Sequence, residues 1–200
     1  VGQPLADGFY RADLDGEKVF GRMTESWEAS YTNYRFWPEM LSSGLMPREA
    51  EEAVVRWRQT HGGELMGMTR FEDRLDDWPV WHYAQGLLRL GQGDAYTMLM
   101  WAHLLHHQMP GWLTAYEQVG IVPDETGWRR PVAGQVVPCQ TTVPLMLQAG
   151  LLWHDPAGRE LWVLPAGALF LKALGGVASS LPAHTPLGPA QVHLELLEGG

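Results

Sequence analysis

The stretch of residues 95–108 constrains the fold more than any other part of the sequence, because it predicts a helix that is apolar on nearly every side. Its apolar residues include Met98, Leu99, Met100, Trp101, Ala102, Leu104 and Leu105. Such a helix is typical of a protein interior. Pro110 and Gly111 follow and must end it, since proline has no backbone N–H to donate. The other elements are therefore expected to pack around this helix.

Helical patterns also precede this stretch. Residues 25–44 carry apolar side chains three or four positions apart. Pro47 opens the next helix, which Gly62 closes, and Pro79 opens another, which ends at Gly91. Short links join successive helices, so the sequence predicts two antiparallel helical hairpins in a row.

The remaining stretches predict loops first and strands later. Residues 63–71 indicate a loop with some short extended character, which ends in the acidic cluster 72–77. Residues 120–138 indicate a long connection, followed by an amphipathic stretch at 140–149. Residues 151–154 and 160–164 are apolar and flank turn residues, which predicts a β-hairpin. A short helix is expected at 165–174, with two more strands around 177–180 and 191–197.

These patterns divide the chain into two regions. Residues 1–150 are expected to hold an N-terminal extended segment and the helical hairpins, and residues 151–200 a small β-rich region. The predicted fold class is mainly α, with antiparallel helical hairpins followed by a small C-terminal β-domain.

Composition narrows the class of partner. The 200 residues are 46% apolar, enough to bury a core, and the formal charge is -9, from 23 acidic and 14 basic residues. Nucleic acids and anionic membranes require a cationic surface, so neither is expected as a partner. A carbohydrate or another neutral small molecule fits this charge better, and ten tryptophans supply aromatic rings for sugar stacking.

The sequence gives few signs of a compartment. No apolar run approaches the roughly 18 residues of a membrane span, and the first residues lack the pattern of a signal peptide. Cys139 is the single cysteine, so it cannot form an internal disulfide, and a buried structural thiol is expected. We therefore expect a cytoplasmic protein.

Three histidines, His103, His106 and His107, stand at i, i+3 and i+4 on the predicted interior helix. Two such imidazoles can bind zinc, and a glutamate between them then serves as base. Leu104 and Leu105 occupy the intervening positions instead. We expect pocket-lining histidines, with His106 and His107 contacting substrate, and neither a metal nor a cofactor.

Glu117 is a candidate catalytic acid or base, because it follows Trp112 and Tyr116 in the stretch beyond the predicted helix end. Neighbouring aromatic rings help a carboxyl group to keep its proton near neutral pH. Glycoside hydrolysis requires a second carboxylate. The acidic cluster offers Asp73, Asp76 and Asp77, and Trp78 beside it is a candidate sugar-binding ring.

The order of these features resembles the C-terminal part of six-hairpin (α/α) toroid glycosidase-like proteins. The resemblance covers residues 95–165 and includes the segments 111–118, 137–144, 151–153 and 160–165. It implies two carboxylates at the mouth of a toroid, of which only Glu117 lies in a matching segment. A complete toroid has about twice the helices counted here, so the chain resembles a terminal fragment whose exposed helical faces a homo-oligomer would cover.

Three functions follow from these observations. The first is a glycoside hydrolase-like protein with Glu117 as acid and one of Asp73, Asp76 or Asp77 as base. The second is a noncatalytic carbohydrate-binding or remnant domain. The third is an ester or lactone hydrolase that uses the histidine cluster, with or without a metal. Neither a Gly-x-Ser-x-Gly elbow nor a nucleotide-binding motif occurs in the sequence.

Overall fold

The computed structural model describes residues 37–60, 62–71, 73–109, 114–155, 160–164 and 180–193. The chain divides into two compact units, Val1–Val143 and Pro144–Gly200. Several expectations lie outside the described residues, namely the N-terminal extended segment, the start of the 25–44 helix, Trp112 and the helix at 165–174.

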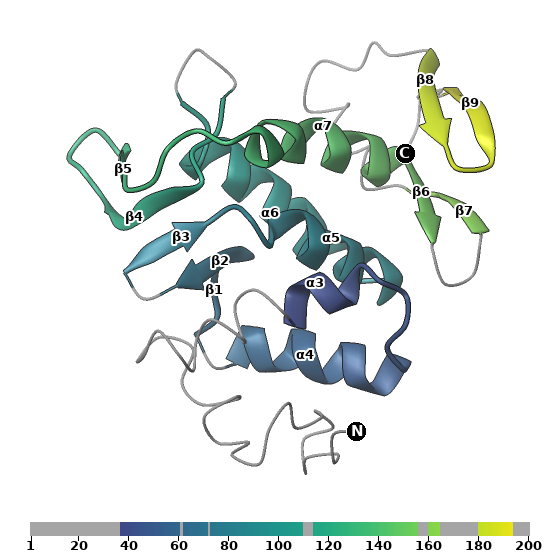
Figure 1. Ribbon diagram of the computed structural model, residues 1–200, viewed down its shortest axis with the longest axis horizontal. Coiled ribbons are helices and arrows are strands. Elements are labelled where there is room, and N and C mark those ends of the chain that lie inside the picture. Colours follow the sequence, from purple (N-terminus) through teal and green to yellow (C-terminus); the bar gives the residue numbers. More distant parts are fainter. Residues whose placement is uncertain are drawn as a thin grey trace, which may run out of the picture. The chain divides into compact units, whose positions relative to one another are not determined.

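The described residues of the first unit form four helices, and a fifth begins there (Figure 1). They are α3 (Trp37–Leu41), α4 (Arg48–Thr60), α5 (Val80–Arg89), α6 (Gly93–His106) and α7 (Val137–Leu151). The helices predicted from Pro47, Pro79 and the apolar stretch at 95–108 are thus confirmed as α4, α5 and α6.

Local residues explain where α4 and α5 begin and end. Pro47 accepts hydrogen bonds from the N–H groups of Ala50 and Glu51 at the start of α4. After α5, Gly91 has a φ of 72°, a conformation that glycine adopts without strain. The N–H groups of Gly91 and Gln92 reach back to the carbonyls of Leu88 and Leu87 at 3.0 and 2.8 Å. These two hydrogen bonds form a Schellman C-cap, which ends α5 and directs the chain into α6.

The α6 helix is interior on one face only. Tyr96, Leu99 and Met100 are at most 1% exposed, whereas Met98 and Leu105 are 53% and 70% exposed. The expectation of a helix buried on all sides is therefore wrong. Apolar residues at the surface are common in folded proteins, so an apolar helix need not be surrounded by protein.

A five-stranded antiparallel sheet lies beside these helices (Figure 1). Its order is β1-β2-β3-β4-β5, and each neighbouring pair is antiparallel. The strands are β1 (Glu64–Leu65), β2 (Met68–Phe71), β3 (Arg74–Asp76), β4 (Gln118–Pro123) and β5 (Arg129–Pro131). Helices α5 and α6 are inserted between β3 and β4 along the chain, so the centre of the sheet joins two distant segments.

This sheet corrects the predicted fold class. The unit is mixed α/β and not mainly α, because the stretches interpreted as loops, 63–77 and 120–138, contribute strands to the sheet. The proposed resemblance to a six-hairpin toroid is wrong as well. The described residues hold five helices, and α5 and α6 are followed by a strand that pairs with β3 and not by a further helical hairpin.

In the second unit, the described residues form two small antiparallel hairpins. The strands β6 (Leu152–Asp155) and β7 (Glu160–Val163) form the hairpin that the sequence predicted, with Trp153 opposite Trp162. These two rings meet edge to face at 5.8 Å. The other pair is β8 (Ser180–Thr185) and β9 (Gly188–His193), where Gly188 has a φ of 118° next to the turn. Leu152, Ala183 and Val192 form a small core within this unit.

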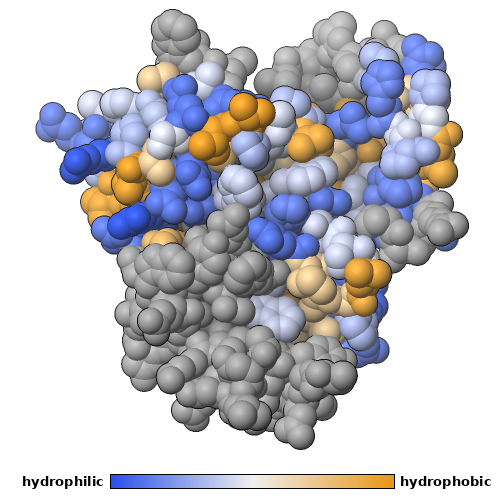
Figure 2. Space-filling view, in the orientation of Figure 1, coloured by the Kyte–Doolittle hydropathy of each residue, from blue (hydrophilic) through white to orange (hydrophobic). Residues whose placement is uncertain are grey.

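The surface carries both charged and apolar side chains (Figure 2). Around the β4–β5 hairpin, at the left of that view, strongly hydrophilic residues alternate with apolar ones. None of the helices in the described ranges has the length and apolar character needed to cross a bilayer.

Candidate active site

Four segments of the first unit meet in a buried polar cluster. The end of β3 supplies Asp76 and Asp77, the end of α6 supplies His103 and His107, and the start of α7 supplies Thr142. The start of β4 contributes Glu117 and Gln118, and the Asp77 N–H donates to the Glu117 carbonyl at 2.9 Å. The cluster therefore exists only where β3 and β4 pair.

The centre of this cluster is an aspartate–histidine pair. Asp77 Oδ1 lies 2.5 Å from His103 Nε2, and neither side chain is exposed. Thr142 Oγ1 donates to Asp77 Oδ2 at 3.3 Å. Burial acts to raise the pKa of Asp77, but the charge and hydrogen bond of His103, with a further contribution from His107, hold that pKa below its ordinary value. Asp77 is therefore ionised near neutral pH.

Both ring nitrogens of His103 have partners. Nε2 contacts Asp77, and Gln108 Nε2 lies 3.2 Å from Nδ1. The Gln108 amide donates to Nδ1 when the ring proton is on Nε2. In this arrangement neither nitrogen is left to activate a nucleophile, so His103 orients Asp77 and does not act as a base.

His107 stacks on His103, with ring centroids 5.5 Å apart. Its Nδ1 lies 3.1 Å from the Tyr116 carbonyl oxygen, which can only accept, so the ring proton is on Nδ1. Its Nε2 is buried and finds no hydrogen-bond partner in the described part of the chain. Burial lowers the pKa of His107 to about 4, so the ring is neutral at physiological pH.

Asp76 differs from its neighbour Asp77 because its pKa is raised and not lowered. Its Oδ1 accepts from the Trp78 N–H at 2.9 Å, and its Oδ2 accepts from Gln118 Nε2 at 2.6 Å. Burial, assisted by the charges of Glu117 and Asp77, nonetheless raises the pKa of Asp76 to about 6. Two adjacent aspartates thus have pKa values shifted in opposite directions, which is a pattern found at acid–base sites.

The structure brings some of the predicted site residues together. Glu117 and Tyr116 are half-buried at the start of β4, next to the buried Asp77 and His107. His106 is half-buried one position before His107, and burial, with Arg129 as a second cause, lowers its pKa. These residues lie in one neighbourhood of the structure.

Two other predicted residues are engaged elsewhere. The Asp73 side chain is 83% exposed and pairs with Arg74 at 3.3 Å, before β3 and not at its carboxyl end. The Trp78 indole N–H donates to Glu39 of α3 at 3.1 Å. Trp112 lies outside the described residues. The acidic cluster is therefore split between a solvent-exposed Asp73 and a buried Asp76–Asp77 pair.

Several residues of the site were not singled out from the sequence. Gln118, Gln108, Thr142 and Gln140 all hydrogen-bond within the site or to the segment beside it. Gln140 holds both backbone groups of Ala115, accepting from its N–H at 3.2 Å and donating to its carbonyl at 2.8 Å. The sequence around an uncharged polar residue carries no signal of such contacts.

Cys139 lies beside this cluster as the expected buried thiol. It is 1% exposed, and burial followed by the charge of Asp77 raises the pKa of the thiol well above its ordinary range. A thiol that stays protonated is a poor nucleophile.

The residues that the structure describes include no group of three or more histidine, cysteine or carboxylate side chains placed to hold a metal ion. No family model, no curated protein and no solved structure matches the chain.

Proposed function

We propose that this chain is a glycoside hydrolase-like protein that acts on a carbohydrate through the paired carboxylates Asp76 and Glu117. One observation carries the proposal: Asp76 has a pKa raised to about 6 and pairs across β3 and β4 with Gln118, the residue that follows Glu117. Glycoside hydrolysis needs one carboxyl group that keeps its proton near neutral pH and one that is ionised.

The environments of the two residues suggest their roles. Asp76 is assigned as the proton donor because its pKa is the raised one, which reverses the role first expected for Glu117. Glu117 is half-buried and is assigned as the carboxylate that activates water or attacks the sugar. Tyr116, also half-buried and adjacent, offers a ring for the sugar to stack on.

A second candidate, a noncatalytic carbohydrate-binding domain, is supported by the burial of Asp76. This residue is 1% exposed, and a catalytic acid must reach the glycosidic oxygen within hydrogen-bond distance. In that case the raised pKa reflects a structural carboxyl group. The ester or lactone hydrolase has less support, because both ring nitrogens of His103 have partners and Cys139 stays protonated.

We propose a carbohydrate or another neutral small molecule as the partner and the cytoplasm as the compartment. We also propose self-association of the chain. It is supported by exposed apolar residues of α6, Met98 and Leu105, and light scattering tests it.

Hydrolysis of a panel of aryl glycosides tests the two candidates. The parent chain is compared with Asp76→Asn and Glu117→Gln, and with Asp73→Asn as a matched control, since Asp73 is exposed and outside the buried pair. We expect turnover to fall at least about 100-fold in the two site variants and to stay within about twofold in the control. Circular dichroism checks that each variant is folded.

The outcomes separate the candidates. If turnover survives both site substitutions, the assignment of Asp76 and Glu117 as the catalytic pair is wrong. A parent without turnover, whose tryptophan fluorescence changes with free sugars, supports the binding domain instead. If Asp73→Asn alone abolishes turnover, the assignment moves to the exposed end of the acidic cluster.

A further inference from the structure

A cleft of about 450 Å³ lies between β3, β4 and β5 at the end of the sheet away from Asp77. Its lining includes Arg74, Gly120 and Arg130 together with Asp73. The pairing of β4 with β5 is irregular between Val119 and Pro123. A register shift of this kind, as in a β-bulge, bends the strand, and this bend explains the concave surface between the strands. Neither the proposed function nor the predicted site residues other than Asp73 involve this cleft.

The charge of the cleft differs from that of the chain. Among the lining residues that the structure describes, Arg74 and Arg130 contribute two positive charges and Asp73 one negative charge, a net charge of +1, whereas the whole chain has -9. Asp73 already pairs with Arg74 at 3.3 Å. Arg130 is exposed and makes no ion pair with any residue that the structure describes. Its guanidinium is available to an anion.

Arg74, the other arginine of the cleft, is held in position by hydrogen bonds. Arg74 Nη1 donates to Gln118 Oε1 at 3.3 Å, and the Gln118 amide is fixed in turn by its 2.6 Å bond to Asp76. A cation that is already oriented loses less conformational entropy when it binds a ligand. The cleft therefore presents one oriented and one unpaired guanidinium.

Gly120 leaves room between these groups. It is directly opposite Arg74 in the β3–β4 register, so a side chain at position 120 would stand on the same face of the sheet. A Cβ atom there would approach only backbone oxygens, at 3.8 and 3.9 Å. The absence of a side chain thus keeps the space opposite Arg74 open.

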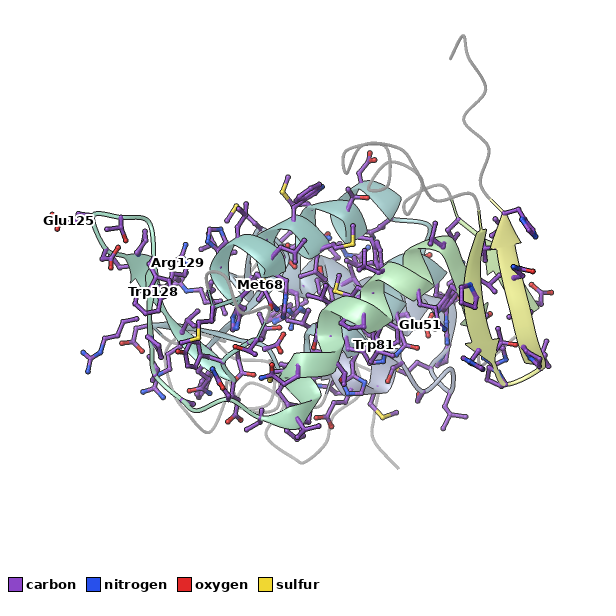
Figure 3. The ribbon with its side chains drawn as sticks, turned by 90° about the horizontal axis from the view of Figure 1, so that it is seen from above. Glu51, Met68, Trp81, Glu125, Trp128 and Arg129 are labelled. Atoms are coloured by element: carbon purple, nitrogen blue, oxygen red, sulfur yellow. The ribbon has the colours of Figure 1, made fainter. Side chains whose placement is uncertain are left out.

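A further cation, Arg129, does not line the cleft but bonds to the backbone of two residues that do. Arg129 is 5% exposed and donates to the carbonyl oxygens of Gly120 and Ile121. In Figure 3, Arg129 and Trp128 lie together in the β4–β5 hairpin, with Glu125 at its far end. Arg129 fixes the backbone of the cleft and adds positive potential behind it.

We propose that this cleft binds the carboxylate of a small molecule, held by Arg74 and Arg130. Guanidinium groups pair with carboxylates through parallel charge-assisted hydrogen bonds. A net charge of +1 matches a monoanion better than a phosphate ester, which carries about 1.5 to 2 negative charges. The carboxylate belongs either to an acidic sugar or to a simple carboxylic acid.

Titration calorimetry on the full chain, with glucuronate, acetate, glucose and inorganic phosphate as probes, tests this proposal. We expect glucuronate to bind more tightly than glucose and phosphate. Arg130→Gln should weaken glucuronate binding at least about tenfold, as loss of a charged hydrogen-bonding group does. Gly120→Val should also weaken binding, because it fills the cleft without removing charge. Arg56→Gln, an exposed arginine of α4, is the matched control and should bind like the parent.

Each outcome decides the proposal. Comparable binding of acetate and glucuronate supports a simple carboxylic acid as the source, and a clear preference for glucuronate supports an acidic sugar. Glucose binding as tightly as glucuronate, phosphate binding more tightly than either carboxylate, or no binding of any probe overturns the proposal. So does an Arg130→Gln variant that binds like the parent. Because none of these readouts depends on turnover, the result is independent of the glycosidase test.

Discussion

His103 Nε2 lies 2.5 Å from Asp77 Oδ1 in an interior where neither side chain reaches solvent. Asp77→Ala would leave the histidine and Thr142 without their shared acceptor. Because two buried donors would then lack this acceptor and pay their desolvation cost, we expect a loss of about 1–3 kcal/mol in the free energy of unfolding, measured by urea titration. Asp73→Ala, at an exposed ion pair, should change it by less than about 1 kcal/mol. Equal effects of the two substitutions would show that the buried pair does not stabilise the fold.

The raised pKa of Asp76 predicts how stability depends on pH. The folded state holds this proton more tightly than the unfolded state, whose pKa is near 3.8. The stabilising contribution is therefore complete below that value and is lost as the pH rises through about 6. In Asp76→Asn this decline should disappear, so the variant gains stability relative to the parent between these values. Unfolding titrations across this range measure it, and a constant difference between the two proteins would contradict the assignment.

A buried ion pair joins α4 to α5. Arg89 Nη1 lies 2.5 Å from Glu51 Oε1, and the side chains are 10% and 2% exposed. Glu51→Gln should cost about 3 kcal/mol of unfolding free energy, because Arg89 keeps its charge in a site with little solvent. The next residue supplies the control, since Glu52 pairs with Arg48 at the surface. Glu52→Gln should cost less than about 1 kcal/mol. Thermal and urea unfolding of both variants would reveal whether the two pairs differ in this way.

Helices α3 and α5 approach closely at Gly86. A Cβ atom at this position would lie 2.9 Å from Leu41 Cδ1 and 3.0 Å from Leu41 Cβ, and Leu41 is fully buried. Gly86→Ala should therefore destabilise the protein by about 1–3 kcal/mol, although alanine is the better helix former. Gly93→Ala in α6 meets no atom within 4 Å and should be neutral or stabilising. A melting temperature that rises in Gly86→Ala would argue against this packing.

The helices could be predicted because their boundaries are encoded locally. Pro47 and Gly91 mark ends of α4 and α5 through backbone properties that act within a few residues. The sheet could not be predicted in the same way. Strand β1 has two residues, and β3 is Arg-Leu-Asp, too short to show an alternation of apolar and polar residues. These strands are stabilised by pairing with their neighbours, and one partner of β3, the strand β4, is far away in the sequence.

For the site, the sequence indicated which residue types could act, but not where each side chain lies in the fold. Glu117, Tyr116, Asp77 and His107 could be proposed from residue type alone, and the structure places them in one neighbourhood. Asp73 looks equivalent to Asp77 in the sequence, four positions away. Only the fold distinguishes them, since the turn before β3 leaves Asp73 in solvent while the end of the strand carries Asp77 into the interior.

The central pairing of β3 with β4 also determines when the polar cluster can form. Asp76 and Gln118, which bond across this pair, are 42 positions apart along the chain. Contacts over such separations form slowly, because the loop between them must close before they stabilise anything. Refolding should therefore show helix formation first, and the buried carboxyl groups should leave water only in the last cooperative step.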